Sequence, residues 1–347
     1  MPCAPNRERG AAAGWSRRLF LGALGGLTML ARGRWTAAQE LRFFRIGTGG
    51  VAGTYYPIGN LIAGIISNPP GARPCDKGGS CGVPGLVATV QSSEGSIANV
   101  RGIVDGSLDS GFVQADVAYD AYRGLGQFAG RPASELRAIA KLYNESIHLL
   151  VRGDRAARGV PDIAGLRISL DEPGSGTLVD ARLVLEAFGV EEARLGGIYV
   201  KPDVAVSMMR RDRLDGFFIV AGYPTAAVTE ATGELGARLV PIKGEPVDRL
   251  IRRYPFFTYD LIPFGVYPGQ PTIETIGVGA LWLVSARLEE ELVYGITKAL
   301  WAPFARRLLD NGHPKGRDIR IENALESVSV PLHVGAERYY REIGILR

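Results

Sequence analysis

Two patterns of apolar residues alternate along this chain: short continuous runs, and stretches in which apolar residues recur with helical spacing. A short apolar run at 43–47 precedes a stretch with the spacing of one helix face, formed by Ile58, Leu61, Ile62, Ile65 and Ile66. The same succession of a short run and a periodic stretch follows at 86–106, 111–122, 166–189 and from 216 onward. This alternation predicts an α/β fold with a mainly parallel sheet flanked by helices.

The succession falls into two series that share a local plan. In the first, a helix leads through Leu108 and Asp109 into the strand at 111–114; in the second, a helix leads through Leu214 and Asp215 into a strand at 216–220. We interpret the series as two lobes with a ligand cleft between them. Their expected extents are 39–146 plus 270–347 for lobe I, and 147–269 for lobe II.

The C-terminal third adds a connection and further elements. Residues 254–275 are rich in proline and aromatic residues and lack periodicity, so we interpret them as a crossover between the lobes rather than a core element. A strand is expected at 276–285, and helices at 288–304 and 336–343.

The first 38 residues have the pattern of an export signal. Arginines at 7–18 precede a 12-residue apolar stretch at 19–30 and small residues just before Gln39. The segment 16–21, Ser-Arg-Arg-Leu-Phe-Leu, matches the bacterial twin-arginine pattern. We therefore expect a twin-arginine-type signal peptide at 1–38 and a periplasmic mature protein, with an uncleaved membrane anchor as the alternative.

Composition and charge narrow the possible partners. The chain has 347 residues, 46% of them hydrophobic and 22% charged, which is typical of a folded globular protein. Of the 40 basic and 36 acidic residues, six arginines and one glutamate lie in the signal segment. The remainder carries a net charge of about −1 and no basic run, which excludes a nucleic-acid partner.

Two cysteines remain after the signal. Cys75 and Cys81 flank a glycine-rich loop, and in an oxidising compartment we expect them to form a disulfide. A metal site is the weaker alternative, because no Cys-x-x-Cys pair is present and the histidines are far apart in sequence.

Five strand-to-helix junctions carry glycine or small polar residues, at 49–56, 91–96, 114–116, 174–177 and 221–224. Ligands of open α/β sheets gather where strands end, and helix N-termini there favour anionic groups. The alternative for each junction is a helix cap. The candidate ligand-binding residues are Thr48, Gly53, Thr54, Tyr55, Tyr56, Ser92, Ser93, Ser96, Asn99, Gln114, Gly174, Ser175, Gly176, Thr177, Ala221, Gly222 and Pro224.

Motifs for catalysis are incomplete. The glycines at 47–52 lack the later carboxylate of a dinucleotide site, Ser175 lacks a full nucleophile elbow, and no Gly-Lys-Ser/Thr ending marks a P-loop. We expect no catalytic residue, no cofactor and no metal, although a secreted α/β hydrolase or transferase remains an alternative.

Taken together, the motifs resemble a known family. They are Gly47–Gly50, Gly53–Pro57, Gly95–Asn99, Gly111–Asp116, Pro173–Thr177, Ala221–Pro224, Thr275–Ala280 and Pro331–His333, in order from about residue 43 to 347. This ensemble resembles the TAXI family, the solute-binding proteins of TRAP transporters. One departure is Val51-Ala52, where many relatives have Thr-Gly.

The resemblance implies a two-lobed periplasmic binding protein of the type II kind. Such a receptor closes on a small organic anion, of the glutamate, glutamine or 2-oxoglutarate type, and delivers it to a membrane permease. We expect a monomer that holds the ligand carboxylate at 174–177, with Asn99 and Gln114 reaching it from the other lobe. A sensor or antigen subunit that binds the same ligands is a further alternative.

Overall fold

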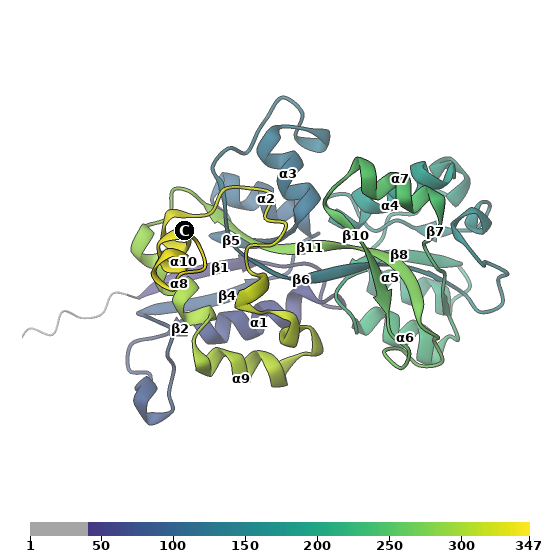
Figure 1. Cartoon of the computed structure of the whole chain (residues 1–347). Helices are drawn as coiled ribbons and strands as arrows, with labels where there is room; N and C mark the ends of the chain where they lie inside the picture. The colour runs from purple at the N-terminus through teal and green to yellow at the C-terminus, as the bar shows by residue number, and fades with distance from the viewer. Residues whose placement is uncertain (1–40) are drawn as a thin grey trace, which may run out of the picture. The chain divides into compact units, whose positions relative to one another are not determined.

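The computed structural model describes residues 41–347 (Figure 1). The predicted signal peptide, its twin-arginine pattern and Cys3 lie outside the described residues. No helix within 41–347 is long and apolar enough to cross a lipid bilayer.

A nine-stranded mixed sheet forms the centre of this part of the chain. Its main order is β4-β1-β5-β11-β6-β8-β7, with β10 paired to β11 and β9 paired to β6. The strands are β1 (Arg42–Gly47), β4 (Leu86–Gln91), β5 (Ser110–Gln114), β6 (Leu136–Val151), β7 (Ile168–Ser169), β8 (Gly216–Ala221), β9 (Arg238–Leu239), β10 (Phe257–Ile262) and β11 (Ile273–Ser285). A separate two-stranded sheet pairs β2 (Ser67–Asn68) with β3 (Val83–Pro84).

Two long strands join the two ends of the sheet. Residues 136–146 of β6 pair with 277–285 of β11, and β5 pairs with 280–284 on the other side of β11. Residues 146–151 of β6 pair with β8. Strands β4, β1 and β5 thus belong to a first lobe and β8 and β7 to a second, at left and right in Figure 1. The proposed boundary at 146/147 falls inside β6, where its partner changes.

The two-lobed α/β fold class is confirmed, but two details differ from the sequence prediction. The sheet is mixed, because β11 runs antiparallel to both β5 and β6. The segment 254–275 is not an irregular crossover: it contains β10 and the start of β11, which form an antiparallel pair. Its prolines lie outside β10, so they do not interrupt the pairing.

Helices cover both faces of the sheet (Figure 1). In the first lobe α2 (Ser96–Asp105) and α3 (Ala115–Arg123) lie on one face, and α1 (Tyr55–Ile66) and α9 (Pro303–Gly312) on the other. In the second lobe α4 (Gly176–Phe188) and α7 (Glu245–Arg253) lie opposite α5 (Pro202–Arg210) and α6 (Ala226–Glu234). The predicted helix at 288–304 is divided into α8 (Glu290–Leu300) and α9, because Pro303 begins a new helix; α10 (Val334–Glu342) ends the fold.

The two Leu-Asp units occupy equivalent places in the two lobes. Asp109 Oδ2 accepts from the backbone N–H and the Nε of Arg45, both at 2.8 Å. Asp215 Oδ2 accepts from the same two groups of Arg167, both at 2.9 Å, and these hydrogen bonds hold the pKa of Asp215 well below its usual range. Each aspartate therefore fastens one strand to its neighbour, which explains the repeated sequence.

A disulfide joins Cys75 to Cys81 at the base of a short loop. The loop precedes β3 and contributes no residue to the ligand cavity described below. A cross-link that closes so few residues is expected to stabilise the fold by about 2 kcal/mol.

Replacing both cysteines with serine is therefore expected to lower the free energy of unfolding by about 2 kcal/mol, because the unfolded chain gains the freedom of the open loop. Denaturant unfolding of the oxidised protein and of the Cys75→Ser/Cys81→Ser variant measures the difference. Reduced wild-type protein is the control and should match the variant. Equal stability of all three samples would contradict the prediction.

Candidate functional site

A cavity of about 60 Å³ lies where strands of both lobes end. One water molecule requires roughly 10–15 Å³, so the cavity accommodates a small solute rather than a polymer. The first lobe contributes the loop after β1 and the start of α2, and the second contributes the loops after β7 and β8 and the start of α5. This is the position at which open α/β sheets bind ligands.

Nine of the predicted ligand-binding residues line this cavity, and they come from all five junctions. They are Gly53, Thr54, Tyr55, Ser96, Gln114, Ser175, Gly176, Thr177 and Ala221. The structure thus brings together segments that are up to 168 residues apart in sequence, as in the hydrogen bond from Thr54 to the Gly222 carbonyl.

The other eight lie outside the lining, and several have structural contacts instead. Asn99 Nδ2 donates to the carbonyls of Thr48 and Phe112, at 2.6 and 2.8 Å. Ser93 Oγ contacts Asn99 Oδ1 at 2.8 Å. These side chains support the loop after β1 rather than facing the cavity. The residues outside the lining are Thr48, Tyr56, Ser92, Ser93, Asn99, Gly174, Gly222 and Pro224.

The start of α4 forms the second-lobe wall. Ser175 caps the helix, because its Oγ accepts from the Leu178 N–H at 3.1 Å. Thr177 Oγ1 accepts from the Val220 N–H at 3.1 Å and so ties α4 to β8. Both hydroxyl oxygens therefore have structural roles, while the helix N-terminus still directs its positive end toward the cavity.

Gly176 allows the two lobes to approach closely. A Cβ on this residue would lie 1.3 Å from Gln114 Oε1 and 2.8 Å from Ser96 Oγ, both in the first lobe. Gln114 in turn donates to Asp180 on α4 at 2.8 Å. Only glycine fits between these groups in the arrangement observed.

Further contacts hold the lobes together around the cavity. The Gly174 carbonyl accepts from the N–H groups of Ile97 and Ala98, both at 3.1 Å. On the other side, the Ala52 carbonyl accepts from Thr225 Oγ1 at 3.1 Å. The structure therefore represents a closed form.

Glu145 is a buried carboxylate of the cavity that the sequence analysis did not identify. It lies on β6 with 1% of its surface exposed, and Tyr55 Oη donates to its Oε2 at 2.6 Å. Burial raises the pKa of Glu145 to about 8. The available sequence signal was a charged residue within the long apolar strand 136–151.

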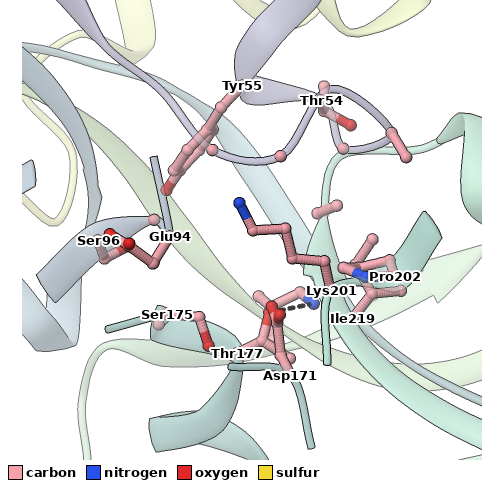
Figure 2. Close-up of a pocket in the computed structure, with 18 of the residues that line it drawn as sticks. Thr54, Tyr55, Glu94, Ser96, Asp171, Ser175, Thr177, Lys201, Pro202 and Ile219 are labelled. Carbon is pink, nitrogen blue, oxygen red and sulfur yellow. Dashed lines mark hydrogen bonds between the residues drawn. The ribbon is translucent and has the colours of Figure 1, made fainter. Parts of the chain in front are cut away.

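Asp171, Glu172 and Lys201 were also missed. Burial raises the pKa of Asp171 to about 7, while the Glu172 N–H donates to its Oδ1 at 2.8 Å and opposes the rise. Lys201 Nζ lies 3.2 Å from Glu172 Oε1. Figure 2 shows the Lys201 side chain extending from the second lobe into the space that Tyr55 and Ser96 face.

The charges of the lining are unequal. Lys201 is its only basic residue, whereas its carboxyl groups are those of Glu94, Glu145, Asp171, Glu172 and Asp203. A ligand that is only anionic would find attraction at the start of α4 and at Lys201, and repulsion elsewhere. A ligand that also carries a positive group would meet a complementary partner on each side.

Comparisons with known proteins agree with this arrangement. A family model described as the NMT1-like family matches residues 46–344. MatC from Rhodopseudomonas palustris, solved with bound malate, is 14% identical, with a TM-score of 0.50 over 88% of this chain and 97% of that one. PhnD1 from Prochlorococcus marinus, in complex with methylphosphonate, is 12% identical, with a TM-score of 0.50 over 87% and 98%. At these identities the likeness shows the two-lobed fold of periplasmic binding proteins.

Thr177→Val is expected to lower the free energy of unfolding by about 1–3 kcal/mol, because it leaves the buried Val220 N–H without its acceptor. Thr177→Ser retains the hydroxyl and is the matched control, with a smaller loss. Denaturant unfolding of the three proteins at neutral pH measures both effects. If valine and serine give equal losses, the hydrogen bond to Val220 does not stabilise the fold.

Proposed function

The chain belongs to the NMT1-like family, and we propose that it is a periplasmic receptor that closes two lobes on a small carboxylate-bearing solute. The cavity between the strand ends of both lobes is the observation that supports this proposal most directly. In this proposal the receptor delivers its solute to a TRAP-type permease, as the TAXI resemblance implies. Export by the twin-arginine route is part of the same proposal.

Two features support a carboxylate as the bound group. The start of α4 offers backbone N–H donors and the positive end of the helix dipole, and Lys201 of the same lobe adds a positive charge. Proteins of the same fold were solved with malate and with methylphosphonate, which are small anions. Of the residues proposed to hold the carboxylate at 174–177, Ser175, Gly176 and Thr177 line the cavity, and Gly174 lies outside its lining.

Glu145 favours amine-bearing solutes within the proposed class. Its buried carboxyl group accepts one hydrogen bond, from Tyr55, and burial raises its pKa to about 8. An ammonium group would supply a second donor, and its positive charge would favour the ionised form of Glu145. Glutamate and glutamine carry such a group next to a carboxylate, whereas 2-oxoglutarate has a carbonyl there. We propose that the protein prefers the amino acids.

A thermal-shift screen of L-glutamate, L-glutamine and 2-oxoglutarate tests the solute class. Binding to the folded form raises stability by about 2.7 kcal/mol at 100 times the dissociation constant, so a true ligand raises the melting temperature in a concentration-dependent way. The amino acids are expected to bind roughly 10–100-fold more tightly than 2-oxoglutarate, the equivalent of one charged hydrogen bond.

Glu145→Gln is the informative variant for this preference. It keeps the shape and removes the charge, so the advantage of the amino acids should largely disappear while 2-oxoglutarate binds no worse. An unchanged preference would show that the ammonium group of the bound amino acid does not contact Glu145. No stabilisation by any carboxylate or amino acid, or the appearance of a product during incubation, would contradict the receptor proposal itself.

Gly176→Ala tests the need for lobe closure. The new Cβ would displace Gln114 from Asp180 or hold the lobes apart, so the affinity for the solute is expected to fall roughly 10–100-fold while the protein still folds. Gly64→Ala is the matched control, because Gly64 lies on the exposed side of α1 with no atom within 4 Å of a new Cβ. Calorimetry measures affinity, and circular dichroism checks folding. Wild-type affinity in Gly176→Ala would rule out closure as observed here.

A further inference from the structure

Two aspartates from opposite lobes meet behind the cavity without lining it. Asp116 lies at the start of α3 in the first lobe, and Asp180 lies on α4 in the second. Their exposed fractions are 6% and 0%, and apolar residues such as Ile97, Val117 and Leu178 surround them. Their carboxyl groups lie close enough to affect each other's protonation.

Neither aspartate forms an ion pair with a positively charged side chain in the described part of the chain. Gln114 Nε2 donates to Asp180 Oδ2 at 2.8 Å, but the Oδ1 atoms of both aspartates are buried without a hydrogen-bond donor in the described part of the chain. The neighbouring groups whose charges act on the pair are Asp120 on α3 and Glu145 on β6, which are also acidic. Arg182, on α4, is engaged with Glu192 at 2.9 Å.

Two carboxylates in contact cannot both remain ionised in an apolar setting, because each is an acceptor and each repels the other. A proton between their Oδ1 atoms supplies the missing donor and removes one charge. We propose that Asp116 and Asp180 form a proton-binding site that lobe closure assembles, so that the receptor takes up one proton together with its solute. This inference rests on the closure described under the proposed function.

The chemical balance of the step is simple. In an open form both carboxylates are hydrated and ionised at neutral pH. On closure a proton from the solvent bonds to one Oδ1 and is hydrogen-bonded by the other, and no other bond changes. A second cavity of about 370 Å³, lined in part by Asp116, Asp120 and Tyr254, gives this proton a path from the solvent.

The direction of the pH dependence follows from the difference between the pKa values of the two aspartates in the open and closed forms. Burial raises the pKa of Asp116, and burial together with the charge of Asp116 raises the pKa of Asp180. The closed form therefore binds a proton that the open form has released. If one proton is taken up, the affinity for the solute rises about tenfold for each pH unit of acidification. This dependence extends from the pKa of the pair in the closed form down to the ordinary carboxyl pKa near 4.

Calorimetry measures this uptake directly. The probe is whichever of L-glutamate, L-glutamine and 2-oxoglutarate gives the largest thermal shift, titrated at pH 7 in phosphate and in Tris, whose ionisation enthalpies differ. Glu145 and Asp171 also titrate, so the quantity of interest is the difference between wild type and Asp180→Asn. We expect that difference to be close to one proton, because asparagine supplies the donor without a proton from solvent.

Asp116→Asn is the second variant and should give the same loss from the other lobe. Asp120→Asn, one turn further along α3, is the matched control and should keep the wild-type proton count. A count that is unchanged in both asparagine variants at the pair would overturn the proposal and leave the receptor function intact.

A measurement without solute separates the two proposals. In solute-free protein labelled with ¹³C at the aspartate carboxyl carbon, infrared spectra should show a protonated carboxyl that grows as the pH falls from 7 to about 5, because protonation of the pair favours closure; one such carboxyl should be missing in Asp180→Asn. If no carboxylate or amino acid binds but this signal is present, the proton site stands and the solute class falls. If the signal is missing in the ligand-free protein and no proton is taken up with solute, the proton site is excluded.

Discussion

The shared strands β6 and β11 are the constraint on which the site depends. Each passes from one lobe into the other, so the ends of β1 and β5 are held opposite those of β7 and β8. The helices that follow these ends then direct their N-termini toward the same small space. The cavity formed in this way has the N-terminus of α4 on one wall and Glu145, on β6, at the junction of the lobes.

Close approach of the lobes has an electrostatic cost that shapes the interface. Gly176 and Gln114 come so near that no side chain fits between them, and carboxyl groups of both lobes lose water there. Burial raises the pKa of Glu145 and of Asp171, because the ionised form loses hydration. We therefore expect solute binding in such a site to be coupled to protonation.

Several residues in or near the site have side chains that stabilise the scaffold. Asn99 anchors the loop after β1, Ser175 caps α4, and Thr177 joins α4 to β8. The repeated contacts of Asp109 with Arg45 and of Asp215 with Arg167 hold the strands of each lobe in the same way. Polar residues at strand-to-helix junctions thus divide between supporting the cavity and forming its surface.

The sequence alone determined the local elements and the two-lobed α/β class, because periodicity and helix-ending glycines such as Gly106, Gly124 and Gly189 depend only on neighbouring residues. It also located the junctions that line the cavity. The strand directions were decided by tertiary structure. β11 lies between β5 and β6, which come much earlier in the sequence, so local patterns could not show its antiparallel pairing. Tertiary structure likewise decided the charge of the site. Glu145, Asp171 and Lys201 belong to no junction motif, and folding alone brings them to one cavity.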